Sequence, residues 1–301
     1  MANYNNILLV SVPRSGSTWI GSVIAHEKNS FMVYEPDNEE VNLRAAFYKR
    51  KYSRYPYLTG RDNSTEYYAL FNRVFNKIVF PDKRNSMYLH KQKQKILRRL
   101  FKRRTLQIMS YDEGKKITKL VKSVHCGLAL EFLIKNFQFK PVILLRHPAN
   151  IALSFQKMNL SESEIDLSAD NKLYNDYLKP YYLKIEQLRQ PLEKIGFQIG
   201  FFYFYFAELK KKYKDIMIIN HDEIINDPEK EFKKLFASLG LIWSNMVEHF
   251  VSSTNKPGEG HQIYRVLDNE KDKWKIHFSE DQLEQLRKGY YILPQTFYKE
   301  F

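Results

Sequence analysis

The stretch Asn6-Ile-Leu-Leu-Val-Ser-Val-Pro-Arg-Ser-Gly-Ser-Thr18 decides the fold of this 301-residue chain. Its first half, Asn6–Val12, is a short apolar run typical of a buried parallel strand. A Gly/Ser loop follows, and Trp19–Ala25 then has the apolar spacing of a helix. A strand, a Gly/Ser loop and a helix in this order are the arrangement with which α/β folds hold a phosphate, so we expect an anion site here.

Strand-like and helical patterns alternate along the rest of the chain. We expect strands over Phe31–Tyr34, Ile117–Val124, Pro141–Leu145 and Asp215–Asn220, and helices over Gly127–Asn136, over Ala149–Phe155, and between the N-cap Asp227 and the C-cap Gly240. This alternation favours a parallel sheet covered on both faces. We therefore predict one α/β domain over residues 1–301, a P-loop-like parallel β-sheet flanked by helices, with a basic, mostly helical insertion over residues 41–110.

The excess positive charge of the chain lies in this insertion. Residues 41–104 contain 18 Lys and Arg and three acids, whereas the other 237 residues contain 30 basic and 31 acidic side chains. Within the insertion, Lys91–Arg104 has eight basic residues, no acid and one apolar face, which predicts an amphipathic basic helix. A near-neutral body with one basic segment indicates an anionic partner that docks at that segment.

Composition excludes several classes of protein. The single cysteine, Cys126, cannot form an intramolecular disulfide, and we expect it to be a buried strand residue. No apolar run approaches the roughly 20 residues of a membrane span, and the first apolar run is too short for a signal peptide. Histidines and cysteine show no metal-ligand spacing, so we expect no metal site. We expect a cytoplasmic protein, with peripheral contact at the inner membrane face left open.

The loop within Pro13–Trp19 carries the groups that bind an anion. Backbone amides at the start of the helix and the hydroxyls of Ser15, Ser17 and Thr18 can hold a phosphate. Gly16 permits the tight turn and the close approach of the anion. The loop has neither the lysine nor the spacing of the Walker A pattern, which disfavours an ATPase or GTPase.

A second anion site is predicted within Leu144–Phe155. Arg146 stands at the carboxyl end of a strand, where ligands bind in open α/β sheets. Pro148 begins the following helix, and Ser154 lies about two turns along it. An arginine at a strand end and a hydroxyl on the next helix together form a site for a second anionic group.

Together, the two motifs resemble those of the sulfotransferases that use 3′-phosphoadenosine 5′-phosphosulfate (PAPS). The family's first motif, Pro-[Arg/Lys]-Ser-Gly-[Ser/Thr]-[Ser/Thr]-Trp, is similar to Pro13–Trp19, and its second, Arg-x-Pro-x5-Ser, is similar to Arg146–Ser154. The resemblance implies that the 5′-phosphosulfate binds Arg14, Ser15, Gly16, Ser17 and Thr18. It further implies that Trp19 stacks on the adenine, that Arg146 and Ser154 bind the 3′-phosphate, and that the product is 3′,5′-adenosine bisphosphate (PAP). The arginine at the second position of the first motif is common in the bacterial and carbohydrate-type branch, and the resemblance spans the chain except about residues 41–110.

In-line transfer of a sulfuryl group to a hydroxyl needs positive charge on the bridging oxygen and a base for the hydroxyl proton. Arg14 and Lys122 are the candidates for the first role. For the base, Glu35 follows the second strand, where bacterial and carbohydrate-type sulfotransferases place a catalytic glutamate. His125 follows the third strand, where cytosolic members have a histidine. We favour Glu35 and keep His125 as the alternative or as a helper.

The insertion also indicates an acceptor. Basic residues alternate there with tyrosines: Arg44, Lys49, Arg50, Lys51, Arg54 and Arg61 with Tyr48, Tyr52, Tyr55 and Tyr57. Sugars stack on aromatic rings, and Arg and Lys pair with carboxylate, phosphate or sulfate groups. We therefore predict transfer from PAPS to a hydroxyl of an anionic glycan or glycolipid. The alternatives are a P-loop nucleotide-dependent kinase and a module that binds an anionic polymer or membrane surface; nucleic acid is not expected as a partner, because the body of the chain is nearly neutral.

Overall fold

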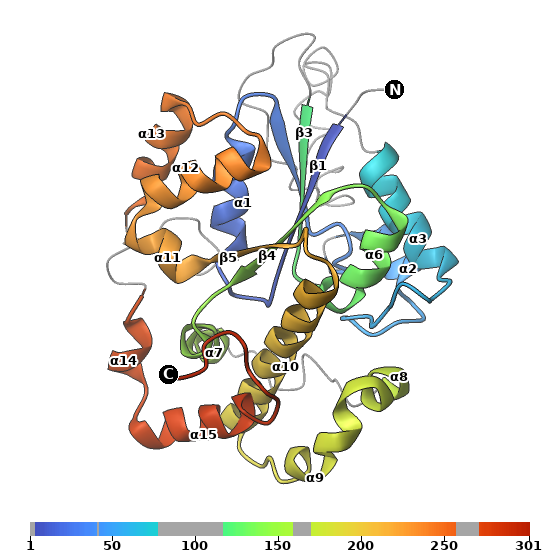
Figure 1. Ribbon diagram of the computed structural model, residues 1–301, viewed down its shortest axis with the longest axis vertical. Coiled ribbons are helices and arrows are strands. Elements are labelled where there is room, and N and C mark those ends of the chain that lie inside the picture. The colour runs from blue at the N-terminus through green and yellow to red at the C-terminus, as the bar shows by residue number, and fades with distance from the viewer. Residues whose placement is uncertain (1–3, 41, 78–116, 159–169, 257–270) are drawn as a thin grey trace, which may run out of the picture. The chain divides into compact units, whose positions relative to one another are not determined.

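The computed structural model describes residues 4–40, 42–77, 117–158, 170–256 and 271–301 (Figure 1). The chain divides into two compact units. Unit 1 comprises Met1–Val10 and Ile20–Pro141, and unit 2 comprises Ser11–Trp19 and Val142–Phe301. The prediction of a single domain over residues 1–301 stays a prediction.

Unit 1 is built on three parallel strands: β1 (Tyr4–Ser11), β2 (Ser30–Tyr34) and β3 (Ile117–Ser123). The strand β3 lies between the other two, with Val10 opposite Ser123 and Tyr34 opposite Lys122. The apolar run of β1 is fully buried from Ile7 to Val10, as a strand covered on both faces requires. Because the strands are parallel and in this register, their carboxyl ends meet at one edge.

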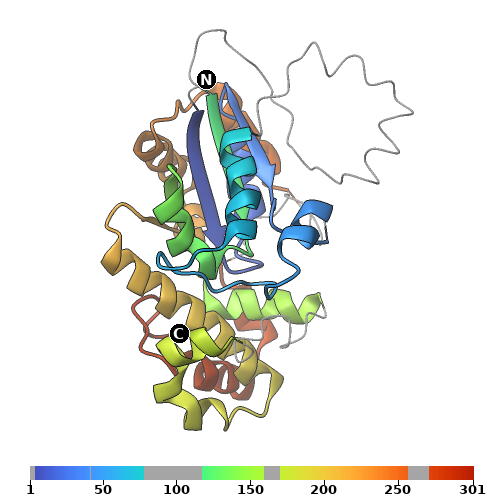
Figure 2. The ribbon, with the colours of Figure 1, turned by 90° about the vertical axis from the view of Figure 1, so that its right-hand side faces the viewer.

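Unit 1 also contains helices outside the sheet. They are α2 (Leu43–Tyr48), α3 (Thr65–Asn72), which continues into η1 (Arg73–Lys77), and α6 (Leu130–Asn136), which follows the 3-10 turn η2 (Gly127–Ala129). Figure 2 shows α3 along the strands. The fully buried Lys119 of β3 donates to the carbonyls of Val74, 3.2 Å away, and Phe75, 2.8 Å away, at the end of this helical segment. Burial lowers the pKa of Lys119 to about 8.

Unit 2 contains the parallel pair β4 (Lys140–Leu145) and β5 (Met217–Asn220), with Leu145 opposite Asn220. Its helices follow the strands or lie beyond them. They are α7 (Pro148–Lys157), α8 (Asn171–Leu173), η4 (Tyr174–Leu178), η5 (Lys179–Tyr181), α9 (Tyr182–Ile185), α10 (Pro191–Lys212), α11 (His221–Asn226), α12 (Pro228–Leu239), α13 (Asn245–Thr254), α14 (Lys273–His277) and α15 (Glu280–Tyr290).

Glycines let α10 and α15 cross with their backbones in contact (Figure 1). A Cβ added at Gly196 would lie 2.1 Å from the carbonyl oxygen of Leu286, and one added at Gly289 would lie 1.7 Å from that of Glu193. Neither distance is possible for a real side chain, so both positions require glycine.

The five strands form a parallel sheet in the order β2-β3-β1-β4-β5. The first helix, α1 (Ser17–Ala25), follows β1, and the next connections return to parallel strands through helices. This confirms the prediction of an α/β fold with a parallel sheet flanked by helices. The predicted caps of α12 are also confirmed, because the Asp227 side chain accepts from the amide of Lys230 and Gly240 has a left-handed φ of 69°.

Several strand boundaries differ from the sequence-based expectation. The third strand ends at Ser123, so Cys126 is buried but lies beyond the strand. The reason is local: the hydroxyl of Ser123 accepts from the amides of His125, at 3.0 Å, and Cys126, at 3.2 Å, which turns the chain out of the sheet. The fifth strand begins at Met217 instead of Asp215.

In the described part of the insertion, α2, α3 and η1 are helical, whereas residues 49–64 between α2 and α3 form turns and irregular chain. The predicted basic helix Lys91–Arg104 lies outside the described residues. Across the described ranges, no helix is both long and apolar enough to cross a membrane.

Candidate functional site

The loop between β1 and α1 contains two residues with a left-handed backbone. Arg14 has a φ of 69° and Gly16 a φ of 85°, so two left-handed residues flank Ser15. Such turns direct successive amides toward one point. A Cβ at Gly16 would lie 2.4 Å from Cδ2 of the His221 ring, so glycine is needed both for its conformation and for this close packing.

Three of the residues predicted to bind anions lie together in unit 2. The Arg14 guanidinium donates through Nε to the hydroxyl of Ser154, 2.9 Å away. The buried Arg146 donates through Nη1 to the carbonyl of Arg14, 3.0 Å away. The loop after β1 is thereby joined to the end of β4 and to α7, which brings two guanidinium groups and a hydroxyl into one place. We call Arg14, Arg146 and Ser154 the arginine cluster.

Hydrogen bonds from α10 and α11 fix the backbone next to this cluster. The Tyr203 hydroxyl accepts from the amide of Arg146 at 2.9 Å and donates to the carbonyl of the same residue at 2.5 Å. One residue later, the amide of His147 donates to Asp222, 2.8 Å away, and Asp222 also accepts from Tyr298. The turn that presents Arg146 is therefore held at consecutive peptide groups.

The His147 ring, as a neutral imidazole, caps the helix that follows this turn. Its Nδ1 accepts from the amide of Ala149 and so caps α7. The ring is stacked on Trp274, with centroids 4.7 Å apart, and meets the edge of Phe301 at 5.1 Å. Burial lowers the pKa of His147 to about 4, which keeps Nδ1 available as an acceptor at neutral pH.

Trp19 lies at the start of α1 with its ring mostly enclosed. Its Nε1 donates to Thr254, 2.9 Å away, and its ring meets Phe232 and His221 edge-on at 5.3 and 6.1 Å. Only 7% of the residue is exposed. Stacking of adenine on Trp19 stays a prediction.

The chemistry of these groups fits a nucleotide with two separate phosphates. The guanidinium groups of Arg14 and Arg146 and the hydroxyl of Ser154 meet at the loop that precedes α1. The side chain of Ser15 is fully buried, and its hydroxyl has no hydrogen-bond partner among the described residues. A buried hydroxyl of this kind is expected where a ligand oxygen completes the bonding.

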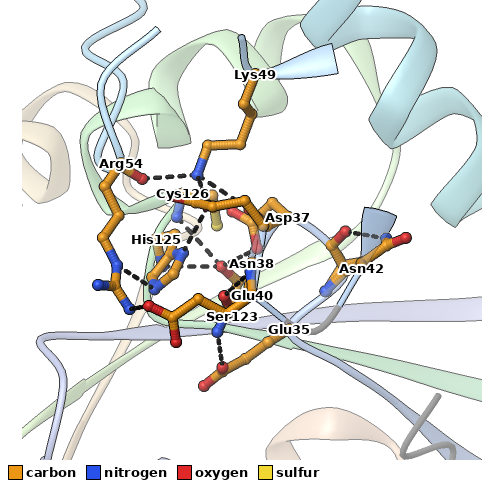
Figure 3. A network of polar contacts seen from close by, with 12 residues as sticks. Glu35, Asp37, Asn38, Glu40, Asn42, Lys49, Arg54, Ser123, His125 and Cys126 are labelled. Atoms are coloured by element: carbon orange, nitrogen blue, oxygen red, sulfur yellow. Dashed lines mark hydrogen bonds and ion pairs between the residues drawn. The ribbon is translucent and has the colours of Figure 1, made fainter. Parts of the chain in front are cut away.

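The second group of predicted residues lies in unit 1, where β2 and β3 end (Figure 3). Glu35 follows β2 with a left-handed φ of 39° and is buried. One carboxylate oxygen is ion-paired with the buried Lys122 of β3, and the other accepts from the Asn38 amide, 2.8 Å away. Burial alone would raise the pKa of Glu35, but Lys122 and Asn38 outweigh it and lower that pKa. Glu35 is therefore a carboxylate at neutral pH.

His125 lies two residues beyond β3 and is enclosed by charged groups. Its Nε2 faces the guanidinium Nε of Arg54 at 3.5 Å, and its Nδ1 lies 3.7 Å from a carboxylate oxygen of Glu39. The ring of Tyr55 meets it edge-on at 5.1 Å. Since a guanidinium only donates, Nε2 is the acceptor and Nδ1 carries the proton that faces Glu39.

Lys49 connects this group to the segment that follows α2 (Figure 3). Its ammonium donates to the carbonyls of Asp37 and Arg54 and to the carboxylate of Glu39, at 3.0, 2.7 and 2.9 Å. Burial opposes ionisation of Glu39, but its bonds with His125 and Lys49 outweigh that effect and lower its pKa to about 2. Lys49 is only 4% exposed, so it holds the chain together and is not presented at the surface.

Residues 6–245 match a family model that is described as "Sulfotransferase family". The chain belongs to the sulfotransferase family. No curated protein matches it.

Solved structures similar to this sulfotransferase include three at low identity. The sulfotransferase domain of the Synechococcus PCC 7002 olefin synthase is 14% identical, with 98% of each chain covered and a TM-score of 0.44. The sulfotransferase domain from the curacin biosynthetic pathway is 13% identical, with 94% of this chain and 96% of that chain covered and a TM-score of 0.47. Mouse sulfotransferase SULT7A1, complexed with PAP, is 13% identical, with 93% of this chain and 81% of that chain covered and a TM-score of 0.42.

Within this sulfotransferase, the predicted site residues therefore form two groups. The loop residues 14–19 lie with Arg146 and Ser154 in unit 2, and Glu35, Lys122 and His125 lie in unit 1. Their assigned roles in binding and catalysis stay predictions.

The motifs do not reveal the residues that support these groups. Asn38 and Asp222 are short polar residues next to strand ends, which is a usable but weak signal. The sequence does not mark Tyr203 or His221 as residues that support the site. An aromatic residue within an aromatic-rich helix, or directly after a strand, is ordinarily part of the core.

Proposed function

We propose that this sulfotransferase transfers the sulfuryl group of PAPS to a hydroxyl of an anionic glycan or glycolipid. The arginine cluster is the observation that supports the donor assignment. In it, Arg14 donates a hydrogen bond to the Ser154 hydroxyl, and Arg146 donates one to the backbone carbonyl of Arg14. Two permanent cations and a helix hydroxyl, beside a loop with left-handed residues, suit a nucleotide that carries a phosphate at each end of its ribose.

In this proposal, the loop residues and the arginine cluster bind the donor. Arg14, Ser15, Gly16, Ser17 and Thr18 hold the 5′-phosphosulfate through backbone amides, hydroxyls and the guanidinium. Arg146 and Ser154 hold the 3′-phosphate, and Trp19 contacts the adenine. When bound, PAPS supplies the sulfuryl group, and PAP is the product. The proposal includes no metal ion.

Glu35 is the proposed general base. Its carboxylate is ionised at neutral pH because Lys122 and Asn38 favour the charged form. Lys122 also supplies positive charge beside Glu35, for the charge that develops during transfer. His125 is the second candidate. Its Nε2 already faces the Arg54 guanidinium, so acceptance of a proton there requires Arg54 to move.

The acceptor assignment is supported by charge. Residues 41–104 carry 18 basic and three acidic side chains, and Arg44, Arg50 and Arg61 are exposed in the part that the structure describes. An anionic saccharide offers both the hydroxyl that accepts the sulfuryl group and the charge that this surface complements.

The decisive experiment is a titration with PAP, AMP, ADP and ATP, followed by thermal unfolding. A ligand that binds only the folded chain stabilises it by an amount that grows with the logarithm of the ligand concentration relative to its Kd, and so raises its melting temperature. PAP is expected to stabilise the chain far more than AMP or ADP, and the Arg146→Lys variant is expected to lose most of this stabilisation. Arg189→Ala, at an exposed arginine of unit 2, is the matched control and should behave as wild type.

Stabilisation by ADP or ATP without any by PAP would reject the sulfotransferase mechanism in favour of a nucleotide-dependent kinase. Once PAP binding is established, transfer of radioactive sulfate from PAPS to a panel of uronic-acid and sulfated oligosaccharides tests the acceptor class. A neutral panel of the same length is the control.

A further inference from the structure

Residues at both ends of the helix α2 are hydrogen-bonded to the turn that begins at Glu35. At its start, the amide of Asn42 donates to the carbonyl of Asn38, 2.9 Å away, and its side chain donates to the carbonyl of Pro36, 2.5 Å away. At its end, Lys49 reaches back to the carbonyl of Asp37, 3.0 Å away. Figure 3 shows Asn42 and Lys49 on either side of this turn. The helix therefore stands in a fixed relation to Glu35.

Two arginines and an aromatic ring are exposed at α2: Arg44 and Phe47 lie on the helix, and Arg50 lies two residues beyond its end. Arg44 and Phe47 are three residues apart and thus share one side of the helix. Phe47 is 59% exposed, and the guanidinium carbon of Arg50 lies 5.2 Å from the centre of its ring. Arg44 and Arg50 are both exposed. We call Arg44, Phe47 and Arg50 the α2 face.

The charge of the α2 face is not balanced by the acids around it. The nearby glutamates are each paired with a different cation: Glu35 with Lys122, Glu39 with Lys49, Glu40 with Arg54, and Glu66 with Lys51. Among the described residues, no carboxylate forms an ion pair with Arg44 or Arg50. Two arginines thus remain available to an external anion.

The tyrosines between α2 and α3 are less exposed than Phe47. Tyr55 and Tyr57 are only 6% and 5% exposed, and Tyr52 bonds to Ser64 beneath the surface. Of the aromatic residues in the described part of the insertion, Phe47 is the most exposed. The guanidinium of Arg50, 5.2 Å from the centre of the Phe47 ring, places a positive charge next to this apolar surface.

We propose that the α2 face binds the acceptor, with a sugar ring against Phe47 and its carboxylate or sulfate group on Arg44 and Arg50. This inference rests on the proposed function and assigns the acceptor-recognition residues of the same enzyme. The two anchors of α2 set the distance from the anionic group to Glu35. The face therefore selects which hydroxyl of an anionic saccharide reaches the base, in addition to binding it.

The test uses a sulfated, uronic-acid-containing disaccharide as the probe, with calorimetry on the full chain. The double variant Arg44→Glu/Arg50→Glu is expected to weaken binding at least tenfold. Phe47→Ala is expected to weaken disaccharide binding severalfold, and the size of this loss should depend little on the salt concentration. Lys135→Glu, at an exposed lysine of α6 in the same unit, is the matched control and is expected to change binding less than twofold. An uncharged disaccharide should bind weakly to all of them.

PAP stabilisation, measured on the same samples, separates the two proposals. If PAP stabilises every variant equally but charge reversal leaves disaccharide binding unchanged, the α2 face is not the acceptor site and the proposed function still stands. If PAP fails to stabilise the wild type, the proposed function itself is wrong.

Two further arms complete the test. A wild-type chain that binds PAP but not the disaccharide overturns the inference. Binding to vesicles with anionic headgroups that is lost in the double variant, with disaccharide binding unchanged, assigns the face to a membrane and also overturns it. If the double variant does not fold, the single variants Arg44→Gln and Arg50→Gln replace it, each with an expected loss of about threefold or more.

Discussion

Arg14 and Ser154 are 140 residues apart in sequence, yet the Arg14 guanidinium donates to the Ser154 hydroxyl across 2.9 Å. The family resemblance assigns the two residues to opposite ends of one nucleotide, the 5′-phosphosulfate and the 3′-phosphate. Their contact means that the two halves of the proposed donor site share a hydrogen bond. A change at either residue is therefore expected to alter both halves.

Ser154→Ala is expected to weaken PAP binding about tenfold, as the loss of one hydrogen bond to a charged group predicts. AMP lacks the 3′-phosphate, so its binding should change little, and the preference for PAP over AMP should fall. Calorimetric titration with both nucleotides measures this ratio. Ser238→Ala, on the exposed side of α12, is the control. An equal loss for PAP and AMP would show that Ser154 acts only through the position of Arg14.

Glu35→Gln is expected to lower kcat by a factor of 10² to 10⁴, since it removes a general base and leaves the shape of the side chain. PAP binding should be unaffected, because no residue of the arginine cluster changes. His125→Asn should lower kcat less than Glu35→Gln does. The reverse order, measured as sulfate transfer at saturating PAPS, would make His125 the base.

Asn38→Ala is expected to shift the acidic limb of the pH–rate profile toward higher pH. The Asn38 amide donates to the ionised carboxylate of Glu35, so its loss favours the protonated form and raises the pKa of the base. The rate at low pH should fall while the rate on the plateau is retained. Asn175→Ala, at an exposed amide of unit 2, should leave the profile in place. A uniform loss at every pH would instead indicate a structural role for Asn38.

Local sequence signals were sufficient for the elements nearest the Gly/Ser loop. The run from Asn6 to Ala25 predicts a strand, a loop and a helix because an apolar run and helical spacing meet at a Gly/Ser turn. The caps Asp227 and Gly240 bound α12 for the same reason, since each cap acts on its own backbone.

The rest depends on contacts between distant residues. Lys49 and Tyr55 look like surface groups in a basic, aromatic segment, yet both are buried, because Lys49 bonds two carbonyls and Glu39, and Tyr55 packs on His125. The left-handed φ of Glu35 could not be predicted, because left-handed backbone is usually signalled by a glycine and this position holds a glutamate. The helix α10 was not predicted either, and its glycines are explained only by the backbone of α15 that packs against them.

Gly289→Ala is expected to destabilise the chain by about 3 kcal/mol or more, because no side chain fits between α10 and α15. The helices would have to separate to admit the methyl group. Urea unfolding measures the change. Gly60→Ala is the matched control, since an added Cβ there would meet the flexible Glu131 side chain at 3.3 Å. Equal stability of both variants would contradict the close crossing of the two helices.

Acidification is expected to weaken unit 2 through His147. Its folded pKa of about 4 lies below the ordinary value of 6.5, so between these two pH values the unfolded chain binds a proton that the folded chain does not. The contribution of the neutral ring is complete above pH 6.5 and is lost as the pH falls toward 4. Allowing for partial exposure, the loss is on the order of 2 kcal/mol. His147→Asn retains a side chain that can cap α7 but cannot titrate, so the difference in unfolding free energy between wild type and variant should change across this window and stay constant above it. A difference that is independent of pH from 4 to 7 would mean that the folded protein keeps His147 open to protonation, against its burial between Trp274 and Phe301.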